Sequence, residues 1–138
     1  MKYNLKITGE QAKIIKIALE EYIRIRMDQF SDLADDLVFQ NFVYNKSDPE
    51  NSEKFQERID RRDSAILEFH KALLTAQPER KTSNLRKTED MLVAEDIWRV
   101  IRHQLYLDQG GDPHAWCVDA DEPFRQSKEP LPEMGKNE

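Results

Sequence analysis

The chain has 138 residues, of which 35% are charged and 38% are apolar, and its net charge is −6. This length predicts one domain, and the acidic balance argues against a general nucleic-acid binder that works by neutralising phosphates. No apolar run approaches the roughly 18 residues that cross a bilayer, and the N-terminus lacks the apolar core of a signal peptide, so a cytoplasmic location is expected. The single cysteine, Cys117, excludes an internal disulfide and a thiolate-rich metal site.

The first expected elements are a short strand and two helices. Residues 3–7 alternate between apolar and polar side chains, which is typical of a half-exposed strand. Thr8 and Gln11 have the spacing of a capping box, so a helix is expected from residue 9 to about residue 29. An apolar stripe predicts a second helix at about residues 31–44.

Two further helices follow. The third has a seam with the 4-3-4-3-4 spacing of packed helices, formed by Phe55, Ile59, Arg62, Ile66, Phe69 and Leu73. Pro78 ends this helix, and a fourth is expected from residue 88 or 89 to Gly110, which suits a C-cap. Its inward residues are expected to be Val93, Ile97, Val100, Ile101 and Leu105.

These patterns predict a mainly α fold: a compact bundle of about four helices with a short N-terminal strand and an irregular, Pro-rich C-terminal tail. We expect a helical domain at residues 1–109 and an acidic tail at residues 110–138 that packs on the domain or docks a partner. A short strand at residues 115–118 could pair with the N-terminal one. The expected apolar anchors of the tail are Trp116, Phe124, Leu131 and Met134.

Charge is segregated along the chain. Residues 28–53 hold seven acids and one base, residues 54–88 hold nine bases and five acids, and residues 108–138 hold eight acids and three bases. Such runs form solvated faces that complement each other inside a fold. Alternatively, an acidic face binds a basic groove on a partner and imitates a nucleic-acid backbone. Both interpretations stay open at this point.

Two arginines occupy apolar positions of the expected helices. At about 100° per residue, Arg26 and Gln29 fall on the apolar arc of the first helix, and Arg62 lies in the third-helix seam. A guanidinium removed from water needs an anionic partner. The internal candidates are Asp32, Asp35, Asp36 and Asp96. The external candidate is a ligand phosphate or carboxylate, beside which Tyr22, one turn before Arg26, would add an aromatic surface.

The fourth helix offers a second candidate site, because Trp98, Arg102 and Tyr106 are spaced four residues apart. Such a ladder is a cation–π decoration of the surface, or a platform that stacks a base and holds its phosphate. The candidate ligand- or partner-binding residues are therefore Tyr22, Arg26, Gln29, Arg62, Trp98, Arg102 and Tyr106.

Catalytic and metal chemistry find no support in the sequence. His103, His114 and Cys117 lack the further ligands that a zinc site needs, and no local signature surrounds the cysteine. No Gly-rich phosphate loop is present. We therefore expect no enzyme, no metal and no cofactor.

Three segments resemble small uncharacterised proteins of phages and prophages of Gram-positive bacteria. They are LKITGEQA at residues 5–12, ALEEYIRIRMDQF at residues 18–30 and EPLP at residues 129–132. The resemblance implies a phage protein in the host cytoplasm that counters host defence by binding, either blocking an immune nuclease or effector or sequestering a phosphate-bearing nucleotide signal. The alternative is a replication or recombination accessory that acts as an oligomeric interaction module. Neither function involves a membrane or general nucleic-acid binding, and a homo-oligomer is possible.

Overall fold

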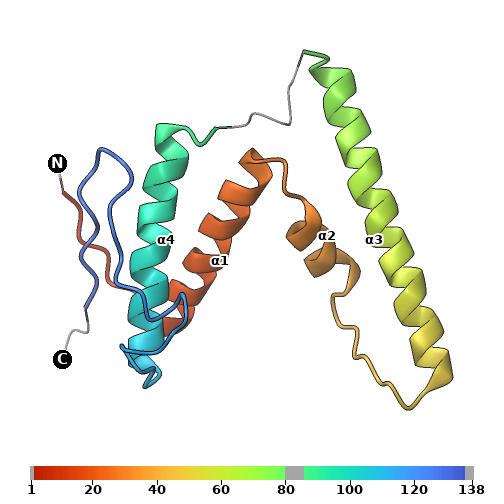
Figure 1. The fold of residues 1–138 in the computed structure, drawn as a ribbon, viewed down its shortest axis with the longest axis horizontal. Helices are drawn as coiled ribbons and strands as arrows, with labels where there is room; N and C mark the ends of the chain where they lie inside the picture. The colour runs from red at the N-terminus through yellow and green to blue at the C-terminus, as the bar shows by residue number, and fades with distance from the viewer. Residues whose placement is uncertain (1, 80–85, 136–138) are drawn as a thin grey trace. The chain divides into compact units, whose positions relative to one another are not determined.

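The computed structural model describes residues 2–79 and 86–135, and these contain four α-helices and no strand (Figure 1). The helices are α1 (Gly9–Arg26), α2 (Ser31–Val38), α3 (Pro49–Ala76) and α4 (Glu89–Asp108). The predicted mainly helical fold is confirmed. The chain divides into two compact units, Met1–Arg26 with Arg86–Glu138 and Met27–Leu85, and each is described by itself.

The predicted strand pair is wrong. Residues 3–7 and 115–118 have no strand structure, and the N-terminal segment lies instead beside residues 130–133, with which it lines a hollow. Ile7 packs against the core of the first unit, whereas Tyr3 and Leu5 are exposed. The alternating pattern at residues 3–7 therefore corresponds to a segment that is anchored at Ile7. A single pair of short strands is marginally stable in water, which disfavours the predicted strand pair.

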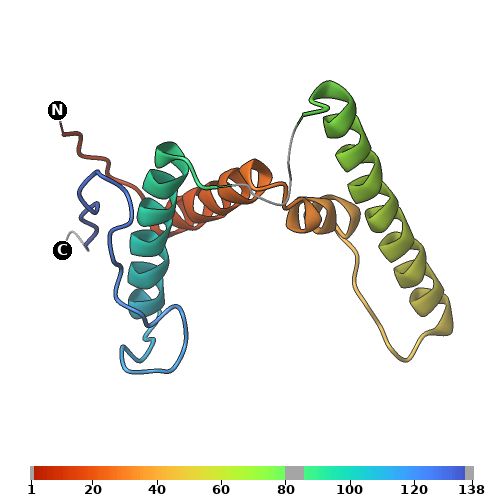
Figure 2. The same cartoon turned by 45° about the horizontal axis from the view of Figure 1, so that its top comes forward.

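The core of the first unit lies between α1 and α4, which pack against each other (Figures 1 and 2). Ala12, Ile101 and Leu105 are buried at its centre. The predicted capping box starts α1. The Gln11 backbone N–H donates to the Thr8 hydroxyl at 3.2 Å, and the Thr8 backbone N–H donates to the Gln11 side-chain oxygen at 2.9 Å. Local sequence therefore determines where α1 begins.

The apolar arc of α1 is wider than the stripe that α4 covers. Ile15 and Leu19 pack against the core, whereas Ile14, the neighbour of Ile15 in the sequence, is 67% exposed. Arg26 is the last residue of α1, and its side chain is 43% exposed. The prediction that Arg26 occupies a dry face is therefore wrong.

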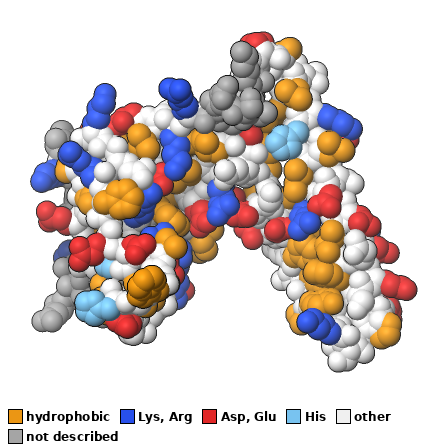
Figure 3. All heavy atoms as spheres, viewed as in Figure 1, with side chains coloured by type: hydrophobic (Ala, Val, Ile, Leu, Met, Phe, Trp, Pro, Cys, Tyr) orange, Lys and Arg blue, Asp and Glu red, His pale blue; other side chains and the backbone are white. Residues whose placement is uncertain are grey.

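The second unit packs α2 against α3. Asp48 caps α3 by accepting the Glu50 N–H at 3.0 Å, and Pro49 occupies the first turn, where its missing N–H costs nothing. Phe30 is buried, with its ring centroid 4.4 Å from that of Phe69. The rings around the N-terminal half of α3 are Phe39, Phe42, Tyr44 and Phe55. Figure 3 shows hydrophobic side chains gathered over this part of α3.

Two helices are shorter than predicted. The predicted second helix extends to residue 44, but α2 ends at Val38, and Asn41 adopts a left-handed conformation with φ 61°. The predicted first helix extends to residue 29, but α1 ends at Arg26, and Asp28 has φ 56°. Asn and Asp tolerate this conformation better than other residues with side chains, so the chain can turn at these two positions.

Candidate binding surface

Arg26 has an internal partner that the sequence did not indicate. Its Nη1 lies 3.0 Å from the Asp90 carboxylate in the first turn of α4 and donates to the Tyr22 hydroxyl at 3.1 Å. The Tyr22 hydroxyl donates in turn to Asp90, and Arg26 Nη2 donates to Thr88 at 3.4 Å. The guanidinium is thus held by a carboxylate of its own unit, at an exposed site.

At neutral pH the Asp90 carboxyl is ionised and the Tyr22 hydroxyl is neutral. Hydrogen bonds from Thr88 and Tyr22, together with the nearby Arg26 charge, lower the pKa of Asp90 to about 2. The hydrogen bond to Asp90 raises the pKa of Tyr22. An external anion would therefore compete with an ionised carboxylate for Arg26.

The Tyr22→Phe variant tests this arrangement. It removes one of the two hydroxyl donors to Asp90, so the carboxylate loses stabilisation of its charged form and its pKa is expected to rise from about 2 toward the usual value for Asp. The measurement is a carboxyl-carbon NMR titration of Asp90 between pH 1 and 6. An unchanged midpoint would contradict the hydrogen bond, and Asp60 on α3 is the control resonance.

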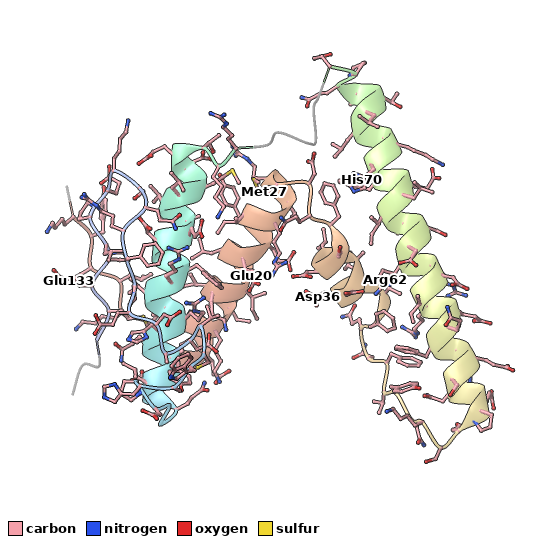
Figure 4. All side chains as sticks on the ribbon, in the orientation of Figure 1. Glu20, Met27, Asp36, Arg62, His70 and Glu133 are labelled. Carbon is pink, nitrogen blue, oxygen red and sulfur yellow. The ribbon has the colours of Figure 1, made fainter. Side chains whose placement is uncertain are left out.

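Arg62 is bound by two carboxylates of the second unit. Its guanidinium lies 3.0 Å from Asp35, one of the predicted internal partners, and 3.0 Å from Asp63. These hydrogen bonds raise the pKa of Arg62. Its side chain is 29% exposed, so it is only half-buried, and Figure 4 shows it on α3 directed toward α2. Gln29 lies beyond the end of α1, belongs to the second unit and is exposed, so its predicted position on the apolar arc of the first helix is wrong.

Arg102 and Tyr106 on α4 lie against a loop at residues 112–121, and Arg102 also covers the ring of Trp98. Arg102 lies 4.4 Å from the centre of the Trp98 ring, and its side chain is only 10% exposed. It donates to the Val118 carbonyl at 2.7 Å, and Tyr106 donates to the Asp112 carbonyl at 3.0 Å. Arg102 and Tyr106 support this loop, so the three side chains do not form an open stacking platform.

The backbone of this loop is fastened at several points. The Asp112 side chain accepts the His114 N–H at 2.9 Å, and the Ala120 N–H donates to the Cys117 carbonyl at 3.1 Å. His103 on α4 contacts the Asp119 carbonyl through Nδ1 at 3.0 Å. Ala120 is buried at the end of the loop. The loop therefore holds its shape through contacts with α4 and through its own turns.

The loop presents a large apolar side chain to solvent. Trp116 is completely exposed, and Cys117 and Val118 beside it are exposed as well. A shallow hollow of about 470 Å³ is lined by Trp116, Val118, Asp121 and their neighbours. The expectation that Trp116 anchors the tail is wrong, because the Trp116 side chain points into solvent. Ala120 is the buried residue of this loop.

The Gly111→Ala variant tests how tightly the loop joins α4. A Cβ at this position would lie 2.5 Å from ring atoms of Tyr106, whose hydroxyl is fixed to Asp112. We expect a loss of about 1–2 kcal/mol in the free energy of unfolding and faster hydrogen exchange of the Ala120 amide. Gly135→Ala is the matched control, because nothing lies within 4 Å of its added Cβ. Equal stability of the two variants would contradict the tight approach.

The tail beyond the loop is tied to α4 by polar contacts, and the ribbon views show it running alongside that helix (Figures 1 and 2). The buried Asp96 carboxylate accepts the Gln126 and Ser127 N–H groups, each at 2.9 Å, and the Ser127 hydroxyl at 2.7 Å. Phe124 stacks on Arg99, with 4.2 Å between the guanidinium carbon and the ring centre. Of the predicted tail, residues 136–138 lie outside the described residues.

The described residues hold no group of three or more His, Cys, Asp or Glu side chains that could bind a metal ion. Within the same part of the chain, the helices are all too short or too polar to cross a membrane. Comparisons with models of known protein families, with curated proteins and with solved structures found no match. The candidate binding surface therefore depends on the geometry of this chain alone, and it consists of the loop at residues 112–121 with Trp116 at its tip.

Proposed function

We propose that this protein is a non-enzymatic phage protein that counters host defence by occupying a surface of a host immune protein with the loop at residues 112–121. The observation that carries the proposal is the complete exposure of Trp116 on a loop that is fastened to α4. Trp is the residue type most enriched among interface hot spots. A loop whose shape is already set loses little conformational entropy on binding, so its indole is well suited to bind a partner.

The contacts of the arginines favour a protein target over a nucleotide signal. Arg26 is paired with Asp90, and Arg62 with Asp35 and Asp63. A phosphate would have to displace these carboxylates, which supports a structural role for both arginines. The phage origin and the immune target follow from the resemblance at residues 5–12, 18–30 and 129–132, and they are part of the proposal.

A second candidate function is an oligomeric accessory of phage replication or recombination that assembles through α3. This helix has 28 residues, none of them buried, and Leu67, Phe69 and Leu74 are exposed on it. Light scattering behind a sizing column measures the mass in solution. A fixed oligomer, combined with no effect of the protein on phage survival in hosts with defence systems, would favour this function over the first.

The Trp116→Ala variant tests the first function. Truncation of a central Trp costs about 2 kcal/mol or more of binding free energy, which is about 30-fold in affinity, and this side chain contributes little to folding because it is exposed. Phages that carry the wild-type or variant gene are plated on hosts with and without defence systems. We expect the variant to lose the plating advantage of the wild type while its thermal midpoint is unchanged.

The matched control is Leu37→Ala, which truncates another exposed apolar side chain in the second unit. This variant should keep the plating advantage. A Trp116→Ala phage that also keeps it would exclude the loop as the binding surface. If the wild-type gene gives no advantage on any defended host, the counter-defence function itself fails.

A further inference from the structure

The segment of the sequence that contains the Trp116 loop is acidic. Residues 108–124 contain no Lys or Arg, and their five acids are Asp108, Asp112, Asp119, Asp121 and Glu122. Three of these carboxylates have partners: Asp108 accepts the Gln104 side-chain N–H at 2.9 Å, Asp119 pairs with Arg102 at 3.4 Å, and Asp112 accepts the His114 N–H. Asp121 and Glu122 are exposed, and Asp121 lines the same hollow as Trp116. The indole and at least one carboxylate therefore face solvent together.

This pairing restricts the chemistry of a complementary surface. An exposed indole gains binding energy when an apolar or aromatic recess removes it from water. Carboxylates beside it favour Lys and Arg on the partner and repel an acidic surface. The matching surface therefore has an apolar or aromatic recess bordered by cations.

Grooves that bind single-stranded nucleic acid have this combination, because Lys and Arg follow the phosphates while aromatic side chains stack on the bases. Resting on the proposed function, we infer that the loop occupies such a groove on the host protein, with the Trp116 indole in the place of a base and Asp121 and Glu122 in the places of phosphates. The net charge of −6 disfavours binding of this protein to nucleic acid. The partner of the loop is therefore a host protein that binds single-stranded nucleic acid.

The experiment first identifies the partner by its contact with position 116. The full chain, with p-benzoylphenylalanine in place of Trp116, is irradiated in defended host cells, and the crosslinked peptide is mapped by mass spectrometry. The identified protein is then purified, and its affinity for the wild-type chain is measured at 50 and 200 mM salt. A (dT)20 oligonucleotide serves as the competitor.

The test variant is Asp121→Asn with Glu122→Gln, which keeps both shapes and removes both charges. We expect its affinity to fall on the order of tenfold at 50 mM salt, with a weaker salt dependence than the wild type, and we expect (dT)20 to displace the wild-type chain. The matched control is Asp36→Asn with Glu57→Gln, two exposed acids of the second unit, which should leave the affinity unchanged.

The outcomes separate this inference from the function on which it rests. A partner that depends on Trp116 but neither on the two carboxylates nor on competition by (dT)20 would overturn the inference and leave the proposed function standing. Crosslinks to nucleic acid or only to a second copy of the chain would also overturn it. If defended cells give no crosslink and the wild-type gene gives no plating advantage, both fail.

Discussion

Replacing Asp96 with alanine is expected to lower the free energy of unfolding of the first unit by about 3 kcal/mol or more. The side chain is 2% exposed, and its carboxylate is the acceptor for two backbone N–H groups and one hydroxyl of residues 126 and 127. Each buried donor that loses its acceptor costs about 1–3 kcal/mol unless water replaces it. The measurement is urea unfolding followed by Trp fluorescence.

The control for this variant is Asp36→Ala, which removes an exposed carboxylate of α2 and should change stability by no more than about 0.5 kcal/mol. A second readout is local: the amides of Gln126 and Ser127 should exchange with solvent much faster in Asp96→Ala than in the wild type, because their acceptor is gone. Unchanged exchange at both amides would mean that Asp96 does not hold the tail on α4.

The same carboxylate gives a pH signature. Burial raises the pKa of Asp96, but hydrogen bonds from the Ser127 hydroxyl and N–H and from the Gln126 N–H outweigh it, so the net shift is downward. A carboxyl whose folded-state pKa lies below its unfolded value stabilises the fold above the unfolded pKa of about 3.9, and this stability is lost as pH falls through the folded pKa. Between pH 7 and 5 the difference in stability between wild type and Asp96→Ala should be constant, and below about pH 4 it should shrink.

Helix starts were predictable because their signals are local. The predicted capping box of Thr8 and Gln11 begins α1. Asp48 and Pro49 begin α3 through an equally local signal, although no helix start was predicted there. The end of α2 was not predictable, because the apolar stripe continues beyond Val38 while the rings of Phe39 and Phe42 turn toward Phe55. That choice depends on packing between segments distant in sequence, which periodicity does not encode.

The candidate binding residues also divide into those with a recognisable sequence signal and those whose position depends on packing between distant segments. Arg62 was expected to need a carboxylate, and Asp35, one of the candidates, lies 3.0 Å away. Asp90 was missed as the partner of Arg26, although an acid in the first turn of a helix is a recognisable position near the positive end of the dipole. The exposure of Trp116 had no sequence signal, since its apolar character predicted an anchor.

Replacing Arg102 with alanine is expected to disorder the loop at residues 112–121 and to lower the free energy of unfolding by about 2–3 kcal/mol. The guanidinium is nearly buried, donates to the Val118 carbonyl, pairs with Asp119 and covers the Trp98 ring. Its loss removes a charge-assisted hydrogen bond of about 1.5–3 kcal/mol and a cation–π contact of about 0.5–1 kcal/mol. The measurements are urea unfolding and hydrogen exchange at the Ala120 amide.

This variant also tests whether Arg102 acts by positioning the loop, without touching the partner itself. Arg102→Ala should weaken capture through position 116 because a disordered loop must be ordered on binding, although the guanidinium itself faces α4 and the loop. Arg102→Lys keeps the cation but lacks the planar fork, so it should recover stability only in part. Arg125→Ala, which truncates an exposed base of the tail, is the control. Wild-type stability and wild-type capture in Arg102→Ala would show that the loop keeps its shape without this guanidinium, through its contacts with Tyr106 and His103 and its own turns.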